Sequence, residues 1–153
     1  MPIIGIISDT HKLLRPEAIN SLQGVDLILH AGDIGAEETI DQLGEIAPVK
    51  AIRGNIDKRD RASRFPMNEV VAVSGKLIYI LHNLADLDLE PAATDFAVVV
   101  SGHSHVPKIG SCDGVLFINP GSAGPRRFKL PIALAKLTVD EFGLYANVEE
   151  LCT

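Results

Sequence analysis

The residues that suggest chemistry are histidines, aspartates and an asparagine placed directly after apolar runs. "VVVSGHSH" brings His103 and His105 to the end of a run of valines, and "LIYILH" ends on His82. Aspartates follow two further runs, "IIGIIS" and "DLILHAG". Imidazole, carboxylate and amide groups are common ligands of divalent metal ions. The predicted ligands are Asp9, His11, Asp33, Asn55, His82, His103 and His105.

This set of side chains is too large for one ion, since a catalytic zinc takes three ligands from the protein. It suits two ions that share one carboxylate. Nitrogen and oxygen ligands without thiolate favour Mn, Fe, Zn, Co or Ni, and we favour Mn. Two divalent cations would outweigh the charge of two aspartates, so the cleft would attract an anionic phosphoryl group.

Structural roles compete with this interpretation at each single position. Asp9, Thr10 and Asn55 could be turn residues or helix caps, and a histidine at a strand end is often only hydrogen-bonded. Glycines in the same motifs, Gly32, Gly54 and Gly102, could supply positive φ. These roles do not explain why four of the five histidines stand at strand ends beside carboxylates.

Short β-branched runs with turn signals between them predict the elements that position these residues. The runs lie at 2–8, 25–30, 48–54, 70–75, 76–82, 96–102, 114–120, 131–139 and 143–151. Helices are expected at 15–24, with Pro16 near its start, and around Ile40, Leu43 and Ile46. Alternation of strand and helix predicts a largely parallel sheet, whose carboxyl ends form a ligand-binding crevice. After residue 105 the helical patterns stop, which predicts a second, more antiparallel sheet.

Composition indicates one globular domain over residues 1–153. The hydrophobic content is 46%, the charged fraction is 22%, and no apolar run reaches the roughly 20 residues of a membrane span. Cys112 and Cys152 lie outside any C-x-x-C motif, which favours a reducing cytoplasm. A net charge of −6 and an aromatic content of 5% disfavour nucleic acid as a partner. The sequence leaves open whether the chain forms a homo-oligomer.

The motifs, in this order along the chain, resemble those of the calcineurin-like metallophosphoesterases, in particular their small bacterial and archaeal phosphodiesterases. The matching segments are D-x-H at 9–11, G-D at 32–33, G-N-x-D at 54–57, His82, G-H-x-H at 102–105 and "NPGS" at 119–122. The resemblance implies an α/β fold, a four-layer α/β/β/α sandwich of two mixed sheets. It also implies a dinuclear hydrolase in which a metal-bridging hydroxide attacks a small phosphoester.

The resemblance further assigns residues to roles. The first ion would be held by Asp9, His11, Asp33 and His105, and the second by Asp33, Asn55, His82 and His103. Asn55 and His103 would also contact the phosphoryl group, while His30 and Asp57 would orient the ligands, unless both serve only loop hydrogen bonds. Basic residues at 53–64 and at Arg126 and Arg127 are candidate substrate contacts, although such clusters are usually solvated loops.

Two positions depart from the family pattern. Asn83 follows His82 where the family usually has Gly; because Asn tolerates left-handed backbone, we expect the turn to be kept, with a narrower cleft. Ile56 stands where monoesterases have a histidine that protonates the leaving group, so we expect a preference for phosphodiesters. The alternatives are a phosphomonoesterase, a nuclease, or a scaffold like the retromer subunit of the same fold.

Overall fold

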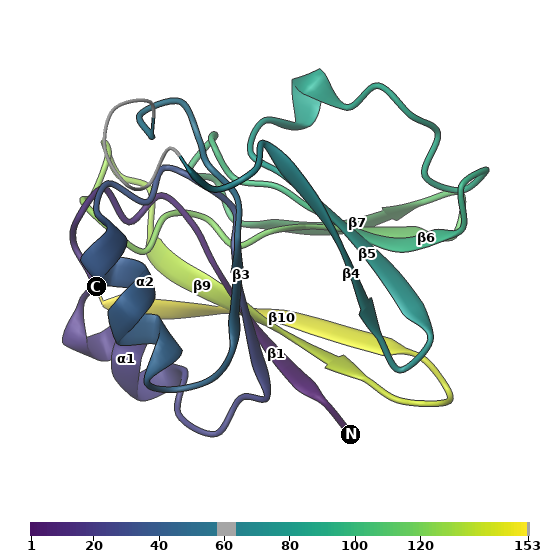
Figure 1. Ribbon diagram of the computed structural model, residues 1–153, viewed down its shortest axis with the longest axis horizontal. Helices are drawn as coiled ribbons and strands as arrows, with labels where there is room; N and C mark the ends of the chain where they lie inside the picture. The colour runs from purple at the N-terminus through teal and green to yellow at the C-terminus, as the bar shows by residue number, and fades with distance from the viewer. Residues whose placement is uncertain (58–63, 153) are drawn as a thin grey trace.

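Two five-stranded sheets packed face to face form the framework of the computed structural model, which describes residues 1–57 and 64–152 (Figure 1). The first sheet has the order β10-β9-β1-β2-β3. Its strands β1, β2 and β3 are parallel, whereas β9 and β10 are antiparallel to their neighbours. The bounds are β1 Ile3–Ile7, β2 Leu27–His30, β3 Val49–Ala51, β9 Ile132–Val139 and β10 Leu144–Cys152.

The second sheet has the order β4-β5-β6-β8-β7. Strands β5, β6 and β8 are parallel, and β4 and β7 are antiparallel strands at its two edges. The bounds are β4 Asn68–Val73, β5 Lys76–Leu81, β6 Phe96–Val100, β7 Lys108–Cys112 and β8 Val115–Asn119. Both sheets are therefore mixed.

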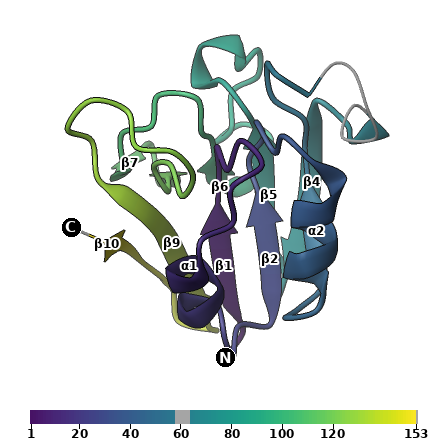
Figure 2. The same ribbon diagram turned by 90° about the vertical axis from the view of Figure 1, so that its left-hand side faces the viewer.

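The main core lies between the two sheets, and a second core lies under the helices. Ile4 and Ile6 of β1 pack toward the second sheet, whereas Ile7 packs with the helices, as the two-residue period of a strand requires. Helices α1 (Pro16–Ser21) and α2 (Glu37–Gly44) cover the outer face of the first sheet (Figure 2). Pro16 opens α1 as predicted, because its fixed φ suits the first helical turn.

The outer face of the second sheet has a thinner cover. Tyr79, Leu81 and Val99 form a cluster there, onto which Leu87 and Leu89 pack. Within the described residues the helical part of this cover is the 3₁₀ helix η2 (Leu84–Asp86). The α/β fold of two mixed sheets is confirmed. None of the described helices is long and apolar enough to cross a membrane.

The predicted boundary between the two sheets was wrong. The second sheet begins at β4, well before residue 105, and β9 and β10 return to the first sheet. Strand β1 has β2 on one side only, so its other edge needs a partner, and Ala135–Thr138 of β9 supply it. Strand β7 was missed because "KIGSC" is mostly polar and small, as an edge strand tolerates.

Candidate metal centre

Four strand ends meet at one edge of the two sheets, in the loops above the arrowheads of β1 and β2 in Figure 2. Asp9 lies at their centre: its Oδ1 is 3.4 Å from Nε2 of His105 and 3.9 Å from Nε2 of both His11 and His82. Asp33 adds its Oδ2, 3.3 Å from Nε2 of His82 and 3.7 Å from Nε2 of His11. Five of the seven predicted ligands thus form one compact cluster.

Each of the two aspartates has one oxygen already engaged. Oδ2 of Asp9 accepts hydrogen bonds from the Ser8 hydroxyl (2.7 Å) and from the His103 backbone N–H (3.2 Å). Oδ1 of Asp33 accepts from the Ile56 backbone N–H at 3.1 Å. These bonds fix both carboxylates, so Asp9 Oδ1 and Asp33 Oδ2 face the histidines. The contribution of Ser8 was not predicted, because a serine beside an aspartate carries no distinctive signal in sequence.

Several polar atoms at the centre lack a hydrogen-bond partner. Among the described residues, the buried atoms Asp9 Oδ1, His11 Nε2, His82 Nε2 and His105 Nδ1 make no hydrogen bond. Buried polar atoms are nearly always paired, so four exceptions in one cluster call for an explanation. A divalent metal ion would satisfy Asp9 Oδ1 and the Nε2 atoms of His11 and His82, and imidazole with carboxylate is a suitable donor set.

The donor atoms divide into two overlapping groups. Asp9, His11 and His105 have ligand atoms within 4.8 Å of one another, and so do Asp9, Asp33 and His82. Asp9 is common to both groups, whereas the family resemblance gives the shared position to Asp33. Since Asp33 Oδ2 lies between His11 and His82, either carboxylate is placed to be shared, and Asp33 as the bridge stays a prediction.

His82 is oriented by the chain behind it. Its Nδ1 donates to the carbonyl oxygen of Ala31 at 2.7 Å, which leaves the Nε2 lone pair directed to the aspartates. Burial lowers the pKa of His82, but the contact with Asp33, the Ala31 carbonyl and the charge of Asp9 outweigh it, so that the pKa is raised. A proton therefore competes with a metal ion for this nitrogen.

Asn55 and His103 lie on the open side of the centre. Nδ2 of Asn55 is 3.3 Å from Nδ1 of His103, and the rings of His103 and His82 meet edge to face with centroids 5.3 Å apart. Asn55 is exposed and His103 half-buried, whereas the other ligand candidates, apart from half-buried His11, are buried. An approaching molecule would meet Asn55 and His103 first.

The backbone is strained where it carries the predicted ligands. Five of them hold left-handed backbone with φ between 48° and 71°, namely Asp9, His11, Asp33, His103 and His105. This conformation costs a non-glycine residue on the order of 1 kcal/mol. Strain concentrated in one loop cluster is typical of functional sites, where packing holds each side chain in place.

Two glycines in the motifs provide room rather than positive φ. A Cβ on Gly54 would meet the backbone nitrogen and Oδ1 of Asp33, and one on Gly102 would meet Oγ of Ser8. Neither glycine is among the described residues with positive φ, whereas Gly32 is, at 102°. The positive-φ interpretation therefore holds for Gly32 alone, and the G-N and G-H pairs reflect close packing of neighbouring loops.

His30 is buried next to the centre and hydrogen-bonds to the backbone of Gly32. Its Nδ1 accepts from the Gly32 N–H at 3.1 Å, and its Nε2 is 3.0 Å from the Thr10 hydroxyl, which donates to the Ile34 carbonyl at 2.9 Å. Burial lowers the pKa of His30 from 6.5 to about 4, so the ring is neutral, as an accepting Nδ1 requires. His30 thus holds the turn that carries Asp33, not its carboxylate.

Asp57 joins the two loops that carry Asp33 and Asn55. Its Oδ2 accepts from the N–H groups of Gly54 (2.9 Å) and Ile34 (3.0 Å), and its Oδ1 from that of Gly35 (3.0 Å). Asp57 is only 1% exposed. Three backbone donors explain why an aspartate, rather than an asparagine, fits this position.

The segment "NPGS" closes the loops against each other. Nδ2 of Asn119 donates to the Gly102 carbonyl and to Oγ of Ser104, both at 3.0 Å. The hydroxyl of Ser122 donates to the backbone carbonyl of Asp9 at 3.1 Å. This segment therefore steadies both the G-H-x-H turn and the backbone of Asp9.

The two departures from the family pattern have local consequences. Asn83 has φ −113°, so its backbone is extended and the expected left-handed turn was wrong. Its Oδ1 instead accepts from the Ala85 N–H at 3.1 Å and starts η2. Ile56 is 49% exposed beside Asn55 and offers no proton.

The predicted basic contacts come from two segments, 53–64 and 126–127. Arg126 and Arg127 are exposed in the segment after Gly124, whose backbone packs on Asp9 and Thr10. Arg64 pairs with Glu37, and Arg53 lines a pocket beside Asn55. Lys58, Arg59 and Arg61 lie outside the described residues. Contact of these side chains with a substrate stays a prediction.

The chain matches a known protein family over most of its length. Residues 3–141 match the model of the calcineurin-like phosphoesterase superfamily domain. The chain is a calcineurin-like phosphoesterase. A probable metallophosphoesterase of Methanocaldococcus jannaschii is 34% identical over 148 residues, covering 91% of this chain and 77% of the relative. The family resemblance drawn from the motifs is confirmed.

Solved structures share the fold of this calcineurin-like phosphoesterase. An archaeal phosphodiesterase superposes with a TM-score of 0.79 at 24% identity, covering 96% of this chain and 99% of that one. Vps29 of Chaetomium thermophilum superposes with a TM-score of 0.78 at 22% identity, covering 98% and 97%. At these identities the likeness concerns the fold alone.

Proposed function

We propose that this phosphoesterase hydrolyses small phosphodiesters with the help of two divalent metal ions, with Mn favoured. The observation that carries the proposal is a set of unpaired buried atoms at close range: Asp9 Oδ1 lies 3.9 Å from Nε2 of both His11 and His82, and His105 places its Nε2 3.4 Å from the same oxygen. Asn55 and His103 complete the set on the open side. Family membership adds support, since the whole group of motifs lies within the matched residues.

The residues of the chain divide the work between holding ions and holding substrate. Bound divalent ions would supply an activated water and positive charge against the phosphoryl oxygens. The amide group of Asn55 presents one oxygen and two N–H donors, so it can bind an ion and donate to a phosphoryl oxygen. His103 provides a second contact from the same side. Ser8, the hydroxyl nearest Asp9, is buried and donates to its carboxylate, so it is no nucleophile.

The preference for diesters follows from the group at position 56. An alkoxide leaving group needs a proton, and an exposed isoleucine offers none. A diester also carries a second substituent, which surfaces around the centre can bind. Alkyl monoesters should therefore react slowest.

A scaffold function is the alternative of a different class. The likeness to Vps29 does not decide between an enzyme and a scaffold, because at 22% identity it concerns the fold alone. A complete donor set with unpaired atoms favours chemistry, since a scaffold gains nothing from strained and unsatisfied ligands.

The test compares two substrates with the same leaving group. Mn-loaded protein is assayed against bis(p-nitrophenyl) phosphate and p-nitrophenyl phosphate, with Asp33→Ala as the inactive control. We expect a higher kcat/KM for the diester. Ile56→His should raise the rate on an alkyl monoester by about 100-fold if the new imidazole acts as a general acid. If the unmodified protein hydrolysed alkyl monoesters faster than both p-nitrophenyl substrates, the protein would be a phosphomonoesterase.

A further inference from the structure

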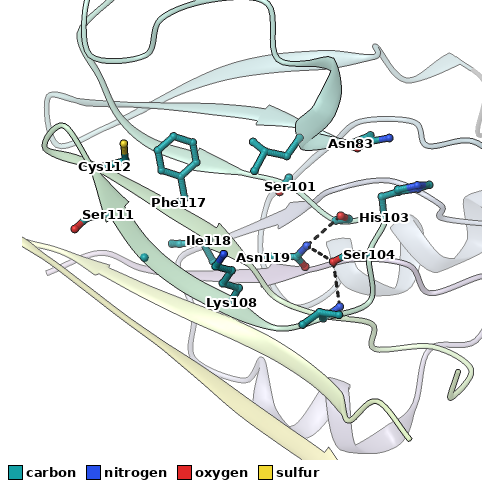
Figure 3. Close-up of a pocket in the computed structure, with 14 residues that line it drawn as sticks. Asn83, Ser101, His103, Ser104, Lys108, Ser111, Cys112, Phe117, Ile118 and Asn119 are labelled. Carbon is teal, nitrogen blue, oxygen red and sulfur yellow. Dashed lines mark hydrogen bonds between the residues drawn. The ribbon is translucent and has the colours of Figure 1, made fainter. Parts of the chain in front are cut away.

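A pocket beside the metal centre has no part in the chemistry described so far. It has a volume of about 440 Å³ and lies between strands β7 and β8, the loop after β6, and η2. Figure 3 shows Phe117 and Cys112 at one end of the pocket and His103 and Asn83 at the other. A single ring system would fit in this volume.

The pocket shares a wall with the centre. His103 lines it, while the backbone N–H of the same residue donates to Asp9 Oδ2 at 3.2 Å. The ring of His103 is also 3.3 Å from the amide of Asn55. A phosphoryl group held by Asn55 and His103 would therefore have this pocket as its immediate neighbour.

The walls of the pocket are mainly apolar. Leu84 and Val106 expose 42% and 45% of their surface, and Phe117 contributes a ring. Two polar wall residues are hydrogen-bonded within the wall: Asn119 donates to Ser104, whose Oγ also accepts from the Val106 N–H at 3.1 Å (Figure 3). Lys108 and Ser111 add further polar groups to the wall. Such walls favour burial of carbon over recognition of a polar group.

A second pocket, on the other side of Asn83, has a different character. Asn55 and His82 connect it to the centre, and Arg53, Asp86 and Asp88 line it. Asn83 lines both pockets and stands between them. Three charged side chains line the second pocket and one, Lys108, lines the first, so an apolar group is better accommodated in the first.

We infer that the first pocket binds an apolar, ring-containing substituent of the phosphodiester substrate, with Leu84, Val106 and Phe117 as its specificity-determining residues. The inference rests on the proposed function, since it assumes a phosphoryl group at the metal centre. It assigns the substrate to the aryl or heteroaryl phosphodiesters. Diesters with two small alkyl groups would leave the apolar walls exposed to water.

Binding of two phosphonates tests the inference without turnover. Calorimetry on Mn-loaded protein compares the affinities of phenylphosphonate and methylphosphonate. The first carries a phenyl ring on phosphorus and the second a methyl group. We expect phenylphosphonate to bind about tenfold more tightly, because the ring buries apolar surface. The double variant Leu84→Ser, Val106→Ser should lose this preference. Val70→Ser, a matched control at an equally exposed valine of β4, should keep it.

Alkylation of Cys112 gives a second readout. Cys112 is exposed, unpaired and lines the pocket. With Cys152→Ser it is the only thiol of the chain. At equal occupancy, phenylphosphonate should slow the alkylation of Cys112 by iodoacetamide, and methylphosphonate should not.

Two results would overturn the inference while leaving the proposed function intact. One is equal affinity for both phosphonates. The other is a ring preference that survives in the double variant while alkylation of Cys112 stays unprotected. If the Mn-loaded protein bound neither phosphonate, the phosphoesterase proposal itself would fail, and the inference would fail with it.

Discussion

His103 combines a left-handed backbone, φ 71°, with a side chain on the open side of the centre. Its backbone N–H donates to Asp9, and glycine and alanine both keep this donor. Glycine accepts this φ without strain, whereas alanine does not. We therefore predict that metal-free His103→Gly is more stable to urea than His103→Ala, by about 1 kcal/mol.

The control is the same pair of substitutions at Asp41, an exposed position in the middle of helix α2. There alanine should be the more stable by about 1 kcal/mol, as in any helix interior. If alanine were also the more stable at position 103, the backbone strain assigned to this loop would be absent in solution.

His30 gives the stability of the metal-free protein a dependence on pH. Burial lowers the pKa of its imidazole to about 4, so the unfolded chain takes up a proton near pH 6.5 while the folded chain does not. The contribution is full above pH 6.5 and is lost as the pH falls toward 4. Between pH 8 and pH 5 the free energy of unfolding should fall by about 2 kcal/mol on account of His30.

Urea titrations at the two pH values check this, with His30→Gln as the reference. The Gln variant removes the titrating group, so its loss of stability between pH 8 and pH 5 should be smaller by about that amount. Identical losses in the two proteins would mean that His30 is protonated in the fold, and the hydrogen bond from Gly32 would then need another acceptor.

At the scale of elements, the loops after β2 and β3 are joined by one side chain. The Asp57 carboxylate accepts three backbone N–H groups, from Ile34, Gly35 and Gly54. Asp57→Asn would turn an NH₂ group toward at least one of these donors. We expect a loss of about 2 kcal/mol in the free energy of unfolding, and weaker Mn binding.

Urea unfolding and a Mn titration of Asp57→Asn measure both effects. Asp41→Asn, at an exposed position of α2, is the matched control and should change neither. Weaker Mn binding without loss of stability would show that Asp57 acts through its charge rather than through the two loops.

The site could be predicted at this scale because its strands are short apolar runs with polar residues directly behind them. Strands β1, β2, β5 and β6 each end within a few residues of a predicted ligand. The bonds that orient those ligands could not be predicted in this way. Ser8, the backbone of Ile56 and the carbonyl of Ala31 become partners only when separate loops meet.

At the scale of the whole molecule, the limit of prediction was the pairing of distant strands. The runs that became β9 and β10 were found, but the place of β9 beside β1 depends on pairing residues more than 120 positions apart, such as Ile6 and Ala135. The hydrophobic pattern of one strand does not predict which strand pairs with it. The predicted ligands that follow strands of the two sheets nonetheless come together, as expected: Asp9 lies within 4 Å of His82 and His105.

The central claim is that this edge holds two divalent ions for phosphodiester hydrolysis. The most direct measurement titrates metal-stripped protein with Mn, and records bound Mn per chain together with the rate on bis(p-nitrophenyl) phosphate. We predict saturation at about two ions per chain, with most of the activity appearing as the second ion binds. Full activity with one ion per chain, or two bound ions without hydrolysis, would contradict the account.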